Sequence, residues 1–81
     1  MRLKKNIAIS ETGFIFNPST GDSFTLNPIG IEILSFIENE KKYEEISDAI
    51  LEKYDVDTIT FEKNYYDFIQ MLKNNHLLEN E

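Results

Sequence analysis

The sequence has no cysteine, no tryptophan and a single histidine among its 81 residues. Without cysteine the chain forms neither a disulfide framework nor a thiolate zinc site, and one histidine is too few for a histidine-based zinc site. Its three glycines are scattered, which excludes a glycine-rich phosphate loop. Basic residues are also scarce, because eight stand against fifteen acidic residues and the net charge is −7. An acidic surface repels phosphate backbones and anionic lipid heads, so neither nucleic acid nor a membrane is an expected partner.

Long apolar runs are missing as well. No window approaches the ~18 apolar residues of a membrane span, and no apolar segment follows the basic start MRLKKN, as it would in a secretion signal. We therefore expect a cytoplasmic protein. With 41% hydrophobic and 12% aromatic residues, the chain is suited to one globular domain, residues 1–81, with a thin margin of stability.

The stretch DVDTITFEKNYY, which starts at Asp55, comes nearest to a metal-binding motif. It begins like a calcium loop, but Ile59 stands where a ligand belongs, Thr60 replaces the turn glycine, and Tyr66 replaces the final glutamate. His76, near the end of the last predicted helix, suits a surface or capping role. The sequence therefore predicts no catalytic residue, no enzyme activity, and neither a metal nor a cofactor.

Alternating apolar residues predict three short strands at residues 3–10, 13–17 and 22–26. The alternating pairs are Ile7 and Ile9, Phe14 and Phe16, and Phe24 and Leu26. The turn formers in ETG and NPSTGD separate the strands, so we expect an antiparallel β-meander over residues 3–26. Each pair can place its side chains on one face of the sheet, and that face then needs a cover.

After Leu26 the apolar spacing becomes helical and predicts helices at 28–38, 44–54 and 60–75. Asn27 is expected to cap the first helix and Pro28 suits its first position, while Asp57 or Thr60 caps the third. The predicted buried stripes are Ile29, Ile33, Phe36 and Ile37, then Ile46, Ala49 and Ile50, then Phe61, Tyr65, Phe68, Ile69 and Leu72. The order is βββααα, an α+β domain of the size of a winged helix.

The third predicted strand, within GDSFTL, has an edge with little protection. It carries only Asp22 as a charge and contains neither lysine nor proline, the residues that commonly block exposed edges. Such an edge can accept a peptide as an added strand. A loop, the N-terminal arm or a second copy of the chain could equally cover it.

Most of the chain, from about residue 3 to 78, resembles the PqqD-like proteins, also called RiPP recognition elements. The resemblance lies in FIFNPSTGDSFTLNPIGIEILSFIENEKKYEEISDAILEKYDVD and FIQMLKNNHLL. These contain a glycine-containing hairpin and helices of the forms N-P-x-G-x-x-I-L-x-x-I, E-I-x-x-x-I-x-x-x-Y and F-I-x-x-L-x-x-x-x-L-L. The resemblance implies a winged-helix-like fold and a protein that binds the leader of a ribosomally made precursor peptide. It further implies presentation of that peptide to a modifying enzyme, often a radical S-adenosylmethionine (radical SAM) enzyme, with no chemistry of its own.

In this family the leader pairs with the edge of the third strand and lies in a groove beside the third helix. Carried onto this sequence, the resemblance implies that the peptide-binding positions are Ser23, Phe24, Thr25, Leu26, Lys63, Tyr66, Ile69, Gln70 and Lys73. The opposite flank of the third helix, with Asn64, Met71 and Asn75, is the alternative. A neutral or basic leader is expected, because this helix has few cations for an acidic one.

Two other functions are compatible with the same pattern. One is a winged-helix DNA-binding or regulatory protein, although Asp55, Asp57, Glu62 and Asp67 flank or occupy the candidate recognition helix. The other is a structural subunit that forms a homodimer through its strand edge.

Overall fold

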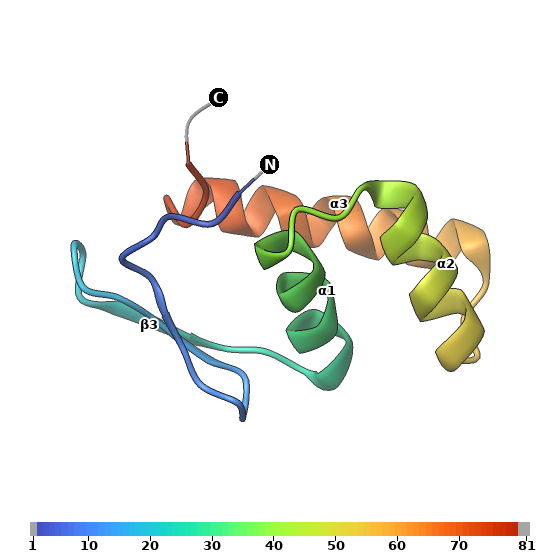
Figure 1. Ribbon diagram of the computed structural model, residues 1–81, viewed down its shortest axis with the longest axis horizontal. Coiled ribbons are helices and arrows are strands. Elements are labelled where there is room, and N and C mark those ends of the chain that lie inside the picture. Colours follow the sequence, from blue (N-terminus) through green and yellow to red (C-terminus); the bar gives the residue numbers. More distant parts are fainter. Residues whose placement is uncertain (1, 80–81) are drawn as a thin grey trace.

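The computed structural model describes residues 2–79, in which three strands precede three helices (Figure 1). The elements are β1 (Ala8–Ile9), β2 (Phe14–Asn17), β3 (Asp22–Thr25), α1 (Pro28–Glu38), α2 (Tyr43–Lys53) and α3 (Thr58–Asn74). The predicted α+β order of three antiparallel strands and three helices is confirmed. No helix within residues 2–79 is long and apolar enough to cross a membrane.

The strands form one antiparallel sheet in the order β1-β2-β3. A tight turn joins β2 to β3, in which the Asn17 carbonyl accepts hydrogen bonds from the N–H groups of Thr20 at 3.3 Å and Gly21 at 2.8 Å. Gly21 has φ +80°, a left-handed conformation that glycine adopts without steric cost. This turn pairs Asn17 with Asp22 and thereby sets the register of β3 against β2.

The first strand is much shorter than the predicted 3–10. The Ile7 N–H donates to the Lys4 carbonyl at 3.2 Å, so the chain turns before β1 begins. Leu3 instead forms an isolated antiparallel bridge with Leu78, near the other end of the chain. The N-terminal arm therefore pairs with the C-terminal residues and does not extend the sheet, a long-range contact that no local pattern in the sequence indicates.

The two faces of β2 are the reverse of what the alternation of Phe14 and Phe16 suggests. Ile15 is fully buried beneath the sheet, and it lies opposite Phe24, so these two share the inner face. Asn17 is also buried on β2, whereas Phe14 and Phe16 are 46% and 38% exposed. The prediction that Phe14 and Phe16 face the covered side is thus wrong, because FIFN offers an apolar residue in both phases of the strand and only the register selects one.

Side-chain caps begin two of the helices. The Gly30 N–H donates to Asn27 Oδ1 at 2.7 Å, so Asn27 caps α1 as predicted. Of the two candidates for α3, Asp57 is the cap, because its Oδ1 accepts the Thr60 N–H at 2.8 Å. As a result α3 begins at Thr58, two residues before the predicted start, and α2 begins one residue earlier than predicted.

Two residues other than glycine end helices in the left-handed conformation. His76 has φ +58°, and the Leu77 N–H that follows it donates to the Leu72 carbonyl at 3.0 Å. Glu40 has φ +56° after α1, where the next N–H reaches back in the same way to Phe36. Both ends are Schellman motifs, which satisfy orphan carbonyls of a helix terminus. The only histidine therefore occupies a capping position.

The core lies where α1 meets the sheet and the other two helices. In Figure 1, α1 stands between the sheet and α2, with α3 passing behind it. The buried apolar side chains come from β2, all three helices and the C-terminal segment: Ile15, Ile33, Leu34, Ile37, Ile46, Ile50, Phe61, Tyr65, Ile69, Leu72, Leu77 and Leu78. Helix α1 buries Gly30, Ile33, Leu34 and Ile37 in this core and leaves Ser35 and Glu38 exposed, so it packs as an amphipathic helix.

One ion pair joins α1 to α2, and it makes a testable contribution to stability. Lys53 Nζ lies 2.7 Å from Glu32 Oε1, and this hydrogen bond holds the pKa of the Glu32 carboxyl below its ordinary value. A lowered carboxyl pKa stabilises the fold above the ordinary pKa, and the contribution is lost as the pH falls through the lowered one.

We therefore expect Glu32→Gln to lower the free energy of unfolding near pH 7 by up to about 1 kcal/mol, the usual range for partly exposed pairs. In acid the wild-type Glu32 carboxyl is protonated and therefore uncharged, like the glutamine, so the difference in the free energy of unfolding should disappear. Urea unfolding at the two pH values measures it, with Glu52→Gln on the exposed face of α2 as the control. A deficit that persists unchanged in acid would assign the effect to packing.

Candidate peptide-binding site

The free edge of β3 is the first feature of the candidate site. Within residues 2–79, β3 pairs only with β2, and β1 lies on the far side of the sheet. The N-terminal arm does not cover this edge, because Leu3 and Lys4 pair with Leu78 and Leu77. Of the covers left open by the sequence, the arm is therefore ruled out.

The hydrogen bonds of β3 toward β2 start from its C-terminal end. The Leu26 N–H donates to the Gly13 carbonyl at 2.8 Å, which makes these two residues a hydrogen-bonded pair. Bonded and non-bonded pairs alternate along an antiparallel ladder, so the next bonded pair is Phe24 with Ile15. The backbone N–H and C=O of Phe24 are therefore used inside the sheet.

The same alternation leaves the intervening residues unbonded to β2. Ser23 and Thr25 form the non-bonded pairs of the ladder, opposite Phe16 and Phe14. Their N–H and C=O groups point away from β2, toward the open edge. Two donors and two acceptors thus form the row that a guest strand would meet, since only alternate residues of the predicted Ser23–Leu26 segment present their backbone outward.

The inner side of the β3 edge is apolar and reaches α3. Phe24 and Leu26 are partly buried and pack against the core, as do Phe68 and Met71 of α3. Gly30 lies at the junction, because a Cβ built on it would be 3.4 Å from the Leu26 Cβ and 3.5 Å from the Phe68 ring. We call Phe24, Leu26, Phe68 and Met71 the apolar strip. Because Gly30 has no side chain, the end of β3 and helix α3 can both approach α1 at this point.

The α3 residues carried over from the resemblance lie elsewhere on the helix. Tyr66 stacks on Tyr43 of α2, with ring centroids 5.9 Å apart, and Ile69 is buried in the core. Lys63, Gln70 and Lys73 are exposed. At about 100° per residue, Tyr66 and Phe68 are about 160° apart around the helix axis. Phe68 lies next to Gly30 of α1, which also contacts Leu26, so this flank of α3 is the one near the end of β3, whereas Tyr66 turns toward α2.

The flank that faces β3 is the alternative from the sequence, with Asn64, Met71 and Asn75. Phe68 belongs to the same flank, although its spacing places it in the predicted core stripe. The apolar stripe of α3 is continuous, so its sequence does not reveal which side of it turns toward the strand. That choice depends on the rotation of α3, which the packing of α1 and α2 decides.

The charge around this edge is neutral to acidic. Asp22 is the charged residue of β3, and its N–H is occupied by Thr20 Oγ1 at 3.2 Å. The α3 flank beside it offers two asparagines and no cation, and the Asn75 amide already donates to the Met71 carbonyl at 2.9 Å. These surroundings support the expectation of a neutral or basic guest.

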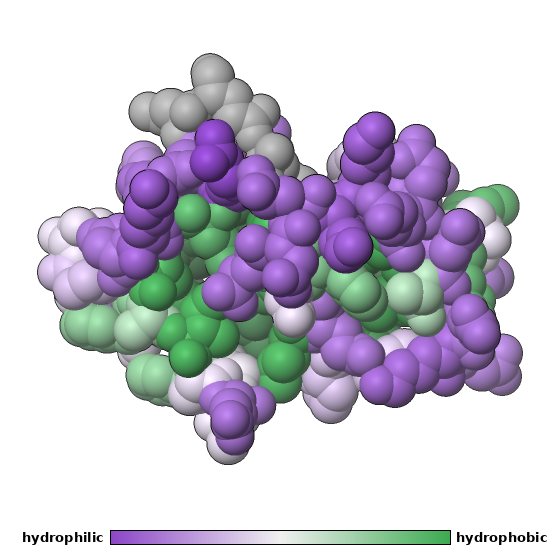
Figure 2. All heavy atoms as spheres, viewed as in Figure 1, coloured by the Kyte–Doolittle hydropathy of each residue, from purple (hydrophilic) through white to green (hydrophobic). Residues whose placement is uncertain are grey.

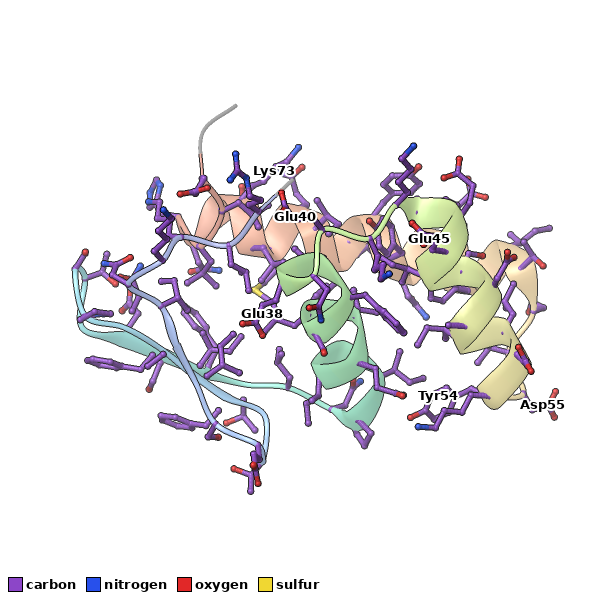
Figure 3. All side chains as sticks on the ribbon, in the orientation of Figure 1. Glu38, Glu40, Glu45, Tyr54, Asp55 and Lys73 are labelled. Atoms are coloured by element: carbon purple, nitrogen blue, oxygen red, sulfur yellow. The ribbon has the colours of Figure 1, made fainter. Side chains whose placement is uncertain are left out.

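A hollow of about 250 Å³ lies at the opposite edge of the sheet, beside β1, and is lined by Ile7, Ile9 and Glu38 among others. Figure 3 shows Glu38 extending from α1 toward the strands, and Figure 2 shows apolar surface over the strands and beside α1. Its rim holds Arg2, whose Nε lies 3.4 Å from Glu40 Oε1. Because this rim is partly neutralised by its own ion pairs, the β3 edge is the stronger candidate.

Comparison with known proteins gives one family match and one structural match, each over most of the chain. The family model described as coenzyme PQQ synthesis protein D (PqqD) matches residues 13–78, which include β2, β3 and all three helices. The solved structure of TbiB1 in complex with the TbiA(beta) leader peptide matches with a TM-score of 0.89 and 33% sequence identity, over 100% of this chain and 98% of that one. No curated protein sequence matches.

Proposed function

The chain belongs to the PqqD family, and on this premise we propose that it is a non-catalytic adaptor that binds the leader of a ribosomally made precursor peptide. The observation that carries the proposal is the open row of backbone groups at Ser23 and Thr25, beside the apolar strip. TbiB1, which shares 33% of its sequence with this chain, was solved with a leader peptide. That relative supports the same class of ligand here.

The proposed mode of binding is strand addition. The leader main chain pairs with the outward N–H and C=O groups of Ser23 and Thr25, which supplies affinity that is independent of sequence. Alternate leader side chains then enter the apolar strip, where Phe24, Phe68 and Met71 supply specificity. Because α1 holds β3 and α3 at a set distance, little of the protein has to be ordered on binding, and this lowers the free-energy cost of association.

We further propose that the adaptor presents its peptide to a separate modifying enzyme, of the radical SAM class, in the cytoplasm where the precursor is made. The acidic helix α2 offers a surface for that enzyme which the leader leaves open. A short reading frame and a radical SAM gene beside the gene for this chain would support this pairing. Co-purification of the enzyme with the chain, with and without leader, tests it directly.

A homodimer formed through β3 is the second candidate, because an open edge pairs as readily with its own copy as with a peptide. Light scattering over a range of concentrations separates the two. A mass that rises with concentration, together with no affinity for leader peptides, would favour the dimer.

Peptide titration followed by amide chemical shifts is the test of the proposed function. We expect leader peptides encoded beside the gene, and the TbiA(beta) leader as a heterologous probe, to shift the amides of Ser23, Thr25 and Leu26 together with those around Phe68 and Met71. A scrambled leader is the control. Saturable binding that leaves the β3 amides in place would refute strand addition, and shifts centred on Tyr66 would return the site to the other flank of α3.

A further inference from the structure

The outer face of the sheet carries no charged side chain along its paired strands. Register and alternation place six residues on this face: Ala8, Ser10, Phe14, Phe16, Ser23 and Thr25. The chain is 28% charged, so an uncharged, solvent-facing sheet surface with two exposed phenylalanine rings indicates a binding partner. That partner has to be uncharged and apolar where it touches the rings.

The two rings lie directly beside the open edge of β3. Phe16 is opposite Ser23 and Phe14 is opposite Thr25, so the rings stand one strand away from the residues whose backbone groups are free. Both intervening side chains are short. No bulky side chain therefore separates the rings on β2 from the position of a strand added to β3. We call Phe14 and Phe16 with Ser23 and Thr25 the aromatic shelf.

A guest strand on β3 necessarily presents side chains to both faces of the sheet. Residues opposite Phe24 point inward to the apolar strip, and residues opposite Ser23 and Thr25 point outward over the shelf. The guest backbone runs about 10 Å, or two strand spacings, from β2. A leucine or an aromatic side chain leaning over serine or threonine closes most of that gap to Phe16 or Phe14, whereas a short or charged side chain leaves the rings in water.

The exposed area argues for a peptide side chain as the occupant and against a folded protein. A phenylalanine offers about 150–250 Å² for burial, so two rings that are 46% and 38% exposed present no more than about 250 Å². A stable protein interface needs about 800 Å² on each partner. The shelf fits two or three side chains of a strand that is already anchored next to it.

We propose that Phe14 and Phe16 form a second specificity surface, which reads the outward-facing side chains of the leader strand bound to β3. The inference rests on the proposed function and narrows its ligand class. The leader segment that pairs with β3 is apolar or aromatic at consecutive positions, with one set of side chains in the apolar strip and the other on the aromatic shelf. Strand addition with inward reading alone would require apolar residues only at every second position.

The test is a selection of 12-residue peptides from a random display library on the full chain, followed by affinity measurements. We expect the enriched peptides to carry apolar residues at both phases of the strand. The double variant Phe14→Thr/Phe16→Thr should bind them roughly 5- to 20-fold more weakly, from two cross-strand contacts. Threonine preserves strand propensity on an exposed face, and urea unfolding verifies that the variant folds.

Two controls make the result specific. Ile59→Thr removes the most exposed large apolar side chain within residues 2–79, 82% exposed in the first turn of α3, and should change affinity less than about twofold. Serine at the outward peptide positions should weaken binding to the wild type but not to the double variant, since the two changes delete the same contact.

Equal affinity of the double variant, or a loss that does not depend on the outward peptide residues, overturns the inference. A drop in oligomeric mass on Phe14→Thr/Phe16→Thr with unchanged peptide affinity also overturns it, because the rings would then be a contact between copies. The chemical shifts of the Ser23 and Thr25 amides distinguish a failure of this inference from a failure of the proposed peptide-binding function. If peptides shift these amides and ignore the rings, only the shelf fails; if no peptide shifts them, the proposed function fails as well.

Discussion

Thr25→Pro is expected to weaken leader binding by at least about tenfold while the protein stays folded, whereas Phe24→Pro, one residue earlier, is expected to unfold it. The Thr25 N–H points to the open edge, so a proline there removes a donor that only a guest strand uses. Tenfold corresponds to about 1.4 kcal/mol, within the range for one hydrogen bond plus a disturbed ladder. The Phe24 N–H belongs to the bonded pair with Ile15, the most deeply buried residue of the sheet.

The matched control is Thr25→Val, which keeps the backbone N–H and replaces only the hydroxyl. Circular dichroism with urea unfolding measures the fold, and fluorescence anisotropy of a labelled leader measures the affinity. If Thr25→Val weakens binding as much as Thr25→Pro, the side chain and not the ladder carries the interaction. If Thr25→Pro binds normally, the leader does not pair with β3.

Gly13→Ala is expected to be the most damaging single methyl addition in the fold, with a loss of about 3–4 kcal/mol in the free energy of unfolding. Gly13 has φ +89°, which costs an L-residue about 1–2 kcal/mol. In addition, a Cβ there would lie 2.5 Å from Ile31 Cδ1 and 3.0 Å from the Leu26 carbonyl oxygen. Overpacking of this kind adds about 1–3 kcal/mol, because the Ile31 side chain has to change its conformation while the Leu26 carbonyl holds the other side of the methyl group.

Gly21→Ala provides the comparison, since Gly21 has φ +80° and no heavy atom within 4 Å of a built Cβ. It should therefore show the conformational cost alone, about 1–2 kcal/mol. Ile31→Ala removes the side-chain atoms that a Gly13 methyl meets, so Gly13→Ala in that background should cost measurably less than in the wild type. Urea unfolding of the four variants gives the coupling. Equal losses at Gly13 and Gly21 would show that the contact with α1 is not tight.

These two predictions concern the same part of the molecule. The Gly13 carbonyl accepts the Leu26 N–H, the hydrogen bond from which the alternation of β3 begins. A side chain at Gly13 would push on Ile31 and Leu26 together, and with them on the junction of β3 and α1. The leader affinity of the Gly13→Ala variant should therefore fall by more than the decrease in its folded fraction explains.

Those features of this protein that depend on neighbours in the chain were predictable from its sequence. Asn27 and Asp57 cap helices because their side chains need only reach an N–H three residues on, and Pro28 starts α1 because its φ is already helical. The absence of blocking residues in β3 was also visible in its sequence, but whether another segment of the chain covers the edge was left open until the sheet order was known. The resemblance of nearly the whole chain to the PqqD-like proteins also indicated the family, which the family model confirms.

The tertiary structure alone decided which sides these elements turn to one another. Phe14 and Phe16 face solvent because the β2–β3 turn sets the register, and a strand with apolar residues in both phases satisfies either choice locally. The flank of α3 nearest to the end of β3 is that of Phe68, because the contact of Phe68 with Gly30 and the stacking of Tyr66 on Tyr43 fix the rotation of the helix. Local sequence determines that an apolar stripe exists, but its orientation depends on contacts between residues far apart in the chain, and these form only when the whole core packs.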